Sequence, residues 1–165
     1  MIDITLETES GYFNYRVGAI IINNGNLLMI KNDNNPYYYS VGGRVQFGET
    51  SEATVLREAF EETQIEFEIE RLAFVHENLF VADFKGNSRF HEIAFFYLMK
   101  QNDRIGSIKC ESTSADGAKE HLHWLPINQL PQYLIYPEFF KTELTQLKSG
   151  VGHFLTQDEK TFRLK

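Results

Sequence analysis

The sequence predicts an α+β fold, and two observations support this prediction. Extended runs rich in β-branched and aromatic residues stand before and after one helical pattern, which covers residues 51–63. A second helical pattern opens at Pro137. The chain has 165 residues, 42% of them hydrophobic, which is enough to bury the core of one domain over residues 1–165.

The first predicted element is a β-hairpin. Residues 15–22 and 27–30 are β-rich runs, and Asn23-Asn24-Gly25-Asn26 between them has the chemistry of a tight turn with positive φ angles. After a polar break, residues 37–41 predict a short strand that ends at Gly42-Gly43.

Two longer strands follow the helical pattern. Residues 67–81 and 88–100 are extended in character, and Lys85-Gly86-Asn87 predicts the turn that joins them. The second run becomes wholly apolar, which is typical of a buried central strand. Residues 121–127 predict the last strand of the fold.

Two further segments are interpreted from their patterns. Residues 102–119 are polar and lack periodicity, so we expect a mobile loop of the kind that often carries function. Pro137 suits the first turn of a helix, and apolar residues recur at helical spacing as far as Leu147. We therefore predict a C-terminal helix over residues 137–147.

The composition is acidic. Asp and Glu number 23 against 16 Lys and Arg, a formal net charge of -7, which argues against a nucleic-acid polymer as a partner. A small anionic substrate remains compatible with this charge if divalent cations stand between its phosphates and the protein's carboxylates.

The sequence also bears on the compartment. Residues 1–10 lack the basic and apolar pattern of a signal peptide, and the longest apolar run, 93–99, is too short to cross a bilayer. The single cysteine, Cys110, is interpreted as an ordinary loop residue and suits a reducing compartment. We therefore expect a soluble cytoplasmic protein without a membrane partner.

The helical pattern over residues 51–63 carries a cluster of acids. On a helical wheel, three glutamates gather within about 100° of one another, on the side opposite three apolar residues. The glutamates are Glu58, Glu61 and Glu62, and the apolar residues are Ala53, Leu56 and Phe60. The glutamates are either the solvated face of an amphipathic helix or the ligands of a cation.

A divalent cation would offset the repulsion among these acids. Like charges at such spacings destabilise a helix by roughly a few tenths of a kcal/mol per pair. Mg²⁺ prefers oxygen ligands and binds phosphates together with one or two protein carboxylates. Just upstream, Gly42-Gly43 can bring a bare backbone close to a ligand, so that a glycine carbonyl supplies another oxygen. The pattern thus predicts a Mg²⁺ site, with Mn²⁺ as the alternative ion.

The residues around this helix resemble the Nudix box, written GX5EX7REUXEEXGU. The motif runs from Gly43-Arg44-Val45-Gln46-Phe47-Gly48-Glu49 through seven residues to Arg57-Glu58-Ala59-Phe60-Glu61-Glu62-Thr63-Gln64-Ile65. The one departure is Gln64, where the family has glycine at a helix exit that favours left-handed backbone. Another residue costs about 1 kcal/mol there if that geometry is kept. The resemblance implies the Nudix fold, a mixed β-sheet sandwiched between α-helices.

The resemblance also implies roles for the matching positions. The implied metal ligands are the Gly43 carbonyl, Glu58, Glu61 and Glu62. Among the implied catalytic residues, Glu58 and Glu61 act with Arg57, which is expected to orient the glutamates and to pair with Glu49. A planar guanidinium holds a carboxylate in a fixed orientation better than lysine does.

The implied reaction is hydrolysis of a small nucleotide. Family members typically cleave a nucleoside diphosphate linked to another group, by water attack at phosphorus, so we expect a nucleotide sugar, a dinucleotide or a nucleoside triphosphate as the substrate. The general base is either a box glutamate or an acid elsewhere. The acids considered outside the box are Glu77, Glu92, Glu111 and Glu120.

Among these acids, Glu92 is singled out as a catalytic candidate. Phe90-His91-Glu92-Ile93 places an acid and a histidine at the start of an otherwise apolar strand, where burial is costly without partners. The alternative for both Glu92 and His91 is a strand-end position that faces water.

Other polar and aromatic residues are interpreted with their alternatives. Arg44, Tyr39 and Phe80 are predicted substrate contacts, and for the two rings core packing is the alternative to stacking on a nucleobase. His121 and His123 share one face of a strand and, with no third ligand apparent, are interpreted as surface histidines. Trp124 is predicted to lie in the core.

Three further expectations concern function and assembly. A catalytically inactive nucleotide sensor or scaffold with the same fold is the alternative to an enzyme, and the intact acids of the box favour the enzyme. An isomerase acting on a diphosphate ester shares the family fold, but the sole cysteine lies in a polar loop and no separate histidine cluster is evident. A homodimer is possible by resemblance, although the sequence specifies no interface.

Overall fold

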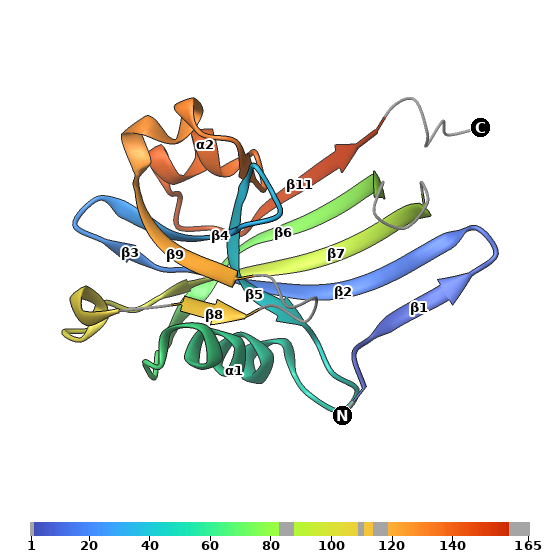
Figure 1. Cartoon of the computed structure of the whole chain (residues 1–165), viewed down its shortest axis with the longest axis horizontal. Helices are drawn as coiled ribbons and strands as arrows, with labels where there is room; N and C mark the ends of the chain where they lie inside the picture. Colours follow the sequence, from blue (N-terminus) through green and yellow to red (C-terminus); the bar gives the residue numbers. More distant parts are fainter. Residues whose placement is uncertain (1, 83–87, 109–110, 114–118, 159–165) are drawn as a thin grey trace.

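The structure, a computed structural model, describes residues 2–82, 88–108, 111–113 and 119–158. A mixed sheet forms the body of the molecule, with α1 against one side and α2 with its neighbouring 3-10 turns on the other (Figure 1). This agrees with the predicted α+β class. Within the described residues, no helix is long and apolar enough to cross a membrane. The predicted turn at residues 85–87 and Cys110 lie outside the described residues.

The elements have the following bounds. The strands are β1 Thr5–Thr8, β2 Gly11–Ile20, β3 Ile22–Asn23, β4 Asn26–Asn32, β5 Tyr38–Arg44, β6 Ile69–Ala82, β7 Ser88–Met99, β8 Glu111–Thr113, β9 Lys119–Pro126, β10 Ile135–Tyr136 and β11 Gly152–Gln157. The helices are α1 Ser51–Thr63 and α2 Phe140–Glu143, and the 3-10 turns are η2 Ile105–Ser107, η3 Ile127–Gln132 and η4 Leu144–Gln146.

The pairing of the strands is mixed. Along the sheet the order is β11-β6-β7-β2-β5-β4-β9-β8, with β1 added to β2, β10 to β5 and β3 to β4. β2 runs parallel to β7, whereas β6 and β7 are antiparallel. The central position of β7, between β6 and β2, explains why residues 93–99 are so apolar, because both faces of this strand are covered.

Two apolar cores occupy the two faces of the sheet. Successive residues of β7 alternate between them: Tyr97 and Met99 belong to the core that contains Val55 and Ala59 of α1, and Phe96 and Leu98 to the core that contains Phe140 of α2. We call these the α1 face and the α2 face. Trp124 packs against the core of the α1 face, as predicted.

The ends of α1 are fixed by local hydrogen bonds. Thr50 caps the first turn, since its Oγ1 accepts from the Ala53 amide at 3.1 Å. At the other end Gln64 has a φ of 59° and a ψ of 24°, so the left-handed geometry that favours glycine is kept at this position. The Gln64 backbone amide donates to the Phe60 carbonyl at 2.8 Å, and its side-chain amide donates to the carbonyls of Phe60 and Glu61 at 3.3 and 3.0 Å, which closes the last turn of the helix.

The predicted hairpin is present at its turn but is shorter than expected. Asn24 and Gly25 both have positive φ, as the turn chemistry requires, and the turn joins β3 to β4. The long strand β2 ends before this hairpin and pairs with β7, β5 and β1 instead. The next strand, β5, does not end at Gly42-Gly43 but continues to Arg44, because Gly42 and Gly43 pair with β2.

The last part of the chain differs more. The segment 102–119 was expected to be irregular, yet it contains η2, whose Ile105 is buried, and β8, which pairs with β9. The strand predicted as the last, β9, is followed by β10 and β11, and β11 lies beside β6. The C-terminal helix is reduced to α2 and η4.

The reduction of this helix has a local cause. The residue before α2, Phe139, makes no side-chain capping bond, and the Thr142 and Thr145 hydroxyls donate to carbonyls three residues back. Such bonds compete with the regular helical pattern.

Candidate active site

Arg57 is the centre of the polar network on α1. Its Nε and Nη2 donate to the two carboxylate oxygens of Glu49, at 3.0 and 3.1 Å, which is the predicted pairing in a bidentate form. Its Nη1 donates to Glu58 at 2.8 Å and lies 3.3 Å from a Glu61 oxygen. Thr54 Oγ1 adds a donor to Glu49, at 2.8 Å. One guanidinium therefore holds three carboxylates of the motif.

The pKa values of two carboxylates bonded to Arg57, Glu49 and Glu58, are shifted in opposite directions. The hydrogen bond from Arg57 lowers the pKa of Glu49 below its ordinary value. Burial raises the pKa of Glu58, and the hydrogen bond and charge of Arg57 oppose that rise. Glu58 is thus a partly desolvated acid whose ionised form gains from further positive charge, such as a cation.

Gly43 and Glu58 lie against one another. A Cβ atom at Gly43 would overlap the carboxylate carbon and both oxygens of Glu58, so only glycine leaves space for this side chain. The contact places an acid beside the β5 backbone on the α1 face, next to Val17, which pairs with Gly43. The donor set, carboxylate and peptide oxygen, is the kind that Mg²⁺ prefers.

The predicted wheel of α1 was wrong about its buried side. Phe60 is 44% exposed, and the buried residues are Thr54, Val55, Ala59 and Thr63. Glu58 and Glu62 lie beside this buried arc and are half-buried, whereas the Glu61 side chain is 56% exposed. The glutamates therefore do not form one solvated face, and two of them turn towards the sheet.

The box glutamates do not converge with other acids into a compact cluster. Among the described residues, no three His, Cys, Asp or Glu side chains are grouped closely enough to hold a metal by themselves. The arrangement instead offers Glu58, the neighbouring peptide of Gly43, and Glu62 one helical turn further on.

Tyr39 and Glu120 extend the site beyond the motif. The Tyr39 hydroxyl donates to Glu120 Oε1 at 2.6 Å, and both residues lie on the α1 face. Burial raises the pKa of Tyr39, and the hydrogen bond to Glu120 and the charges of Glu120 and Glu62 raise it further. Tyr39, predicted as a substrate contact, therefore responds to the charge of the box glutamate Glu62 and is bonded to Glu120, an acid outside the motif.

Glu92 lies elsewhere. It is 9% exposed, in the middle of β7 between Asn14 and Asn78, so a strand-end position facing water is wrong for it. Its neighbour His91 is exposed, as that alternative requires. Because Glu92 follows the alternation of Ala94 and Phe96, it belongs to the α2 face and is not brought together with Glu58.

The other predicted substrate contacts are dispersed. The Arg44 side chain is 44% exposed and lies 3.8 Å from Asp3. Phe80 stacks on Phe90, with ring centres 5.1 Å apart, which places it in a ring stack on the α2 face.

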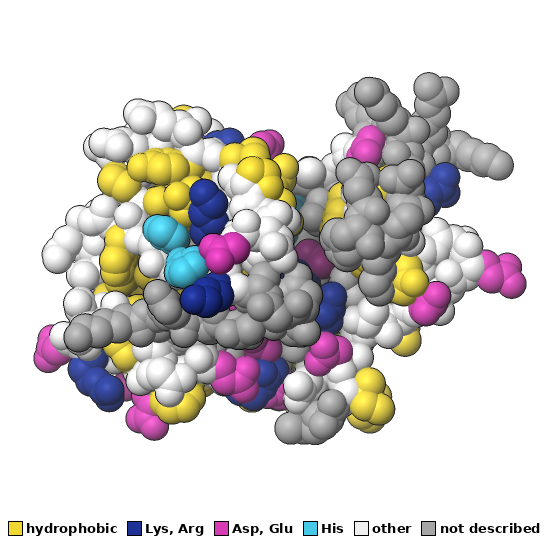
Figure 2. Space-filling model, in the orientation of Figure 1, with side chains coloured by type: hydrophobic (Ala, Val, Ile, Leu, Met, Phe, Trp, Pro, Cys, Tyr) yellow, Lys and Arg dark blue, Asp and Glu magenta, His cyan; other side chains and the backbone are white. Residues whose placement is uncertain are grey.

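The histidine pair is divided between two contacts. His121 lies 3.1 Å from Asp33, and His123 packs against the Tyr38 ring. Figure 2 shows histidine side chains, in cyan, at the surface of this view of the molecule. Asn14 and Arg16 on β2 were not predicted as site residues from the sequence. The signal that could have identified them is the presence of polar residues at alternate positions of an otherwise apolar strand.

Comparisons with known proteins concern the family and the fold. The NUDIX domain model matches residues 13–143. A MutT NUDIX hydrolase from Burkholderia pseudomallei has 26% identity and a TM-score of 0.59, over 82% of this chain and 98% of that one. A mutator MutT protein from Bacillus halodurans has 18% identity and a TM-score of 0.64, over 88% and 92%.

A third solved structure has lower sequence identity. An ADP-ribose pyrophosphatase from Streptococcus suis has 12% identity and a TM-score of 0.54, over 87% of this chain and 98% of that one. No protein of curated function matches the chain by sequence. The family model covers most of the chain, and the chain therefore belongs to the NUDIX domain family.

Proposed function

We propose that the chain hydrolyses a nucleoside diphosphate linked to another group, with a divalent metal held by the box glutamates. The observation that carries this proposal is the contact between Glu58 and Gly43: a half-buried carboxylate packed on bare backbone and fixed by Arg57. An acid in this environment is expensive to ionise unless positive charge is added.

The residues present fit Mg²⁺ or Mn²⁺. Glu58, Glu62 and the Gly43 carbonyl would hold the ion, Glu61 would support a further one, and every donor is an oxygen. When bound, such a metal neutralises charge on the phosphate oxygens and lowers the pKa of a bound water. Arg57 acts on the reaction through the glutamates that it orients.

Glu120 is the best-placed general base among the acids considered outside the box whose side chains the structure describes. Tyr39 fixes its carboxylate with a hydrogen bond of 2.6 Å, and the charge of Glu62 contributes to the raised pKa of Tyr39, whereas Glu92 belongs to the other face. An acid here can accept the proton of the attacking water if the phosphate lies at the box glutamates. Tyr39 is then a positioning residue.

The linked-nucleotide class has support from the proteins of similar fold. One is named an ADP-ribose pyrophosphatase and another a UDP-X diphosphatase. Sequence identities this low establish a shared fold and not a shared substrate. The test therefore includes a nucleotide sugar, a dinucleotide and a nucleoside triphosphate. The single domain, the cytoplasmic location and the homodimer remain predictions of the sequence.

The test is a hydrolysis panel. Purified protein with Mg²⁺ should release phosphate-containing products from at least one of ADP-ribose, UDP-glucose, diadenosine polyphosphates and nucleoside triphosphates. Glu62→Gln should lower kcat by about a hundredfold or more while thermal unfolding stays unchanged. Glu52→Gln, an exposed position in the first turn of the same helix, is the matched control.

The panel also decides between the enzyme and the alternative. Tight nucleotide binding without turnover under Mg²⁺, Mn²⁺ or any other divalent ion would establish the sensor or scaffold function and overturn the hydrolase proposal.

A further inference from the structure

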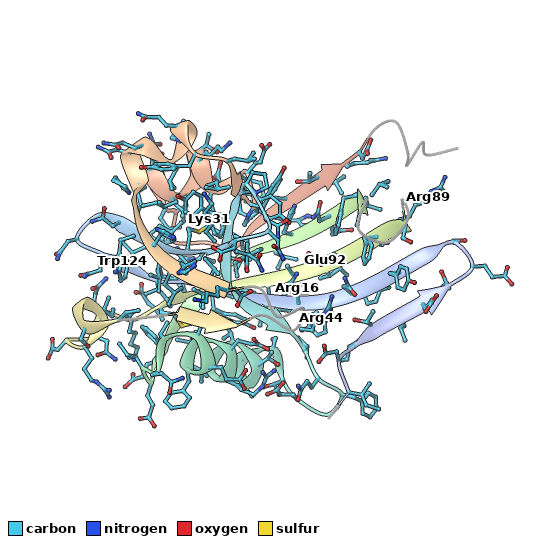
Figure 3. All side chains as sticks on the ribbon, in the orientation of Figure 1. Arg16, Lys31, Arg44, Arg89, Glu92 and Trp124 are labelled. Carbon is cyan, nitrogen blue, oxygen red and sulfur yellow. The ribbon has the colours of Figure 1, made fainter. Side chains whose placement is uncertain are left out.

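Five strands of the sheet extend beyond the helices as a wing. β1, β2, β7, β6 and β11 are neighbours in this order, and in Figure 1 their ends project to the right, away from α1 and α2. Figure 3 shows Arg89 of β7 at the far end of this wing. The wing continues the α1 face on one side and the α2 face on the other.

The two faces of the wing differ in burial. On β7 the side chains that belong to the α2 face, Phe90 and Glu92, are buried. The side chains that alternate with them belong to the α1 face, and of these His91 is exposed and Ile93 is half-buried. The Phe13 ring of β2 packs edge-on against His91, with ring centres 5.8 Å apart, so it lies on the same face. Solvent therefore reaches the α1 face of the wing.

This solvent-exposed face is apolar. Each of the five strands contributes one apolar residue to it, and we call these residues the wing patch: Leu6, Phe13, Ile93, Leu79 and Leu155. The register aligns Leu6, Phe13 and Leu79 in one row and places Ile93 and Leu155 in the next. Leu6 is 59% exposed and Leu155 is 58% exposed. The solvated face of a sheet usually carries polar side chains, and a contiguous apolar patch marks an interaction surface.

The charges around the wing patch suit a second copy of the same chain. Arg89 and Glu77 both lie on this face by alternation along their strands, and Glu77 Oε1 is 2.7 Å from His153 Nε2. The face thus carries both signs of charge, although the whole chain has a formal net charge of -7. Two copies that meet through this face avoid the like-charge repulsion that the net charge would otherwise cause.

The area of the face suits a weak dimer. Five strands about 4.8 Å apart and three rows of side chains about 6.8 Å apart cover roughly 500 Å² on one copy. Two copies would bury about 1,000 Å² in total, which is the lower limit for a specific interface. A dimer held by such an area should have a Kd in the micromolar range.

We propose that two copies of the chain pair face to face through the wing patch. Sheets that pack in this way lie about 10 Å apart with their strands nearly aligned. β7 is the middle strand of the wing, so a two-fold axis along it would place β2 of one copy against β6 of the other. Phe13 of each copy would then meet Leu79 of the other. The inference does not depend on the proposed function, since no residue of the wing patch belongs to the candidate active site.

Sedimentation equilibrium of the full chain tests the pairing, at concentrations from about 1 to about 500 µM. Wild type should pass from monomer to dimer with a Kd of roughly 10–100 µM. Leu6→Glu and Leu155→Glu each place two like charges in the apolar contact, and each should raise the Kd about tenfold or more. Because both leucines are more than half exposed in the single chain, both variants should unfold at the same temperature as wild type when all are monomeric.

A matched control keeps the same chemical change outside the wing. Leu134 is 44% exposed and precedes β10, so Leu134→Glu should dimerise as wild type does. Loss of the dimer in Leu6→Glu and Leu155→Glu, with the control unaffected, supports the proposal.

Two results overturn the proposal. Wild type that stays monomeric up to about 500 µM would leave the wing patch to a different partner. A dimer that persists equally in Leu6→Glu, Leu155→Glu and Leu134→Glu would place the contact on another surface.

Discussion

Tyr39 donates a hydrogen bond of 2.6 Å to Glu120 and thereby joins β5 to β9 on the face of the sheet that α1 covers. Burial, the hydrogen bond and the charges of Glu120 and Glu62 all raise the pKa of this phenol, so it remains a neutral donor at physiological pH. The bond fixes the orientation of Glu120, the acid outside the box that we propose as the general base.

Removal of this hydroxyl should impair the reaction more than binding. In Tyr39→Phe we expect kcat to fall about tenfold and KM to change by less than about threefold, because Glu120 loses its fixed orientation. The measurement is steady-state hydrolysis of the best substrate of the panel at neutral pH. Tyr38→Phe, which removes a hydroxyl from the preceding residue of β5, is the control. An unchanged kcat in Tyr39→Phe would exclude this positioning role.

Gly43 should tolerate no side chain. In Gly43→Ala the new methyl group would overlap the carboxylate of Glu58 and displace it from the backbone, so we expect weaker Mn²⁺ binding and a loss of kcat of about a hundredfold. Electron paramagnetic resonance measures free Mn²⁺ directly, and initial rates give kcat. Gly106→Ala serves as the comparison, because its Cβ would meet nothing within 4 Å. Normal Mn²⁺ affinity in Gly43→Ala would count against the proposed ligand set.

Local patterns predicted the elements that local chemistry determines. Helix α1 has the predicted bounds because Thr50 caps it and its apolar spacing is helical. The turn at Asn24-Gly25 forms because its residues accept positive φ. The parallel pairing of β2 with β7 could not be predicted from local sequence patterns, because it joins residues such as Asn14 and Glu92 that are distant in sequence.

The site, too, could be predicted only as far as local patterns determine it. The spacing of the motif gave Arg57 and its glutamates, but the burial of Phe60 was misjudged because the wheel does not show which side meets the sheet. Glu92 was selected for the correct reason, a costly buried acid, but its face depends on the register with β2 and β6. Glu120 bonds to Tyr39 on β5, a contact between strands that are distant in sequence.

His76 should make stability depend on pH. It is 4% exposed, and burial, with a further contribution from His153, lowers its pKa from 6.5 to about 4. The unfolded chain therefore binds this proton at a higher pH than the folded chain does. Stability is full above pH 6.5 and is lost as the pH falls towards 4, by up to about 3 kcal/mol.

Urea unfolding at pH 7 and pH 4.5 measures this loss. His76→Gln keeps a polar group near Thr156 but cannot take up the proton, so its free energy of unfolding should change less between the two pH values than that of wild type. His91→Gln, at an exposed position on β7, should behave as wild type does. Equal losses in wild type and His76→Gln would assign the acid sensitivity to other groups.

Gln64 holds left-handed backbone at the end of α1 and offsets part of the strain through its own side chain. Its amide donates to two carbonyls at the helix end, but these bonds are exposed and add little, whereas the left-handed geometry costs a non-glycine residue about 1 kcal/mol. Gln64→Gly should therefore raise the free energy of unfolding by roughly 0.5–1 kcal/mol. Gln64→Ala keeps the strain without the amide and should lower it. Because the Gln64 side chain bonds the Glu61 backbone carbonyl and not its carboxylate, kcat should be the same in all three proteins. If urea unfolding shows Gln64→Gly to be less stable than wild type, the side-chain bonds outweigh the backbone strain.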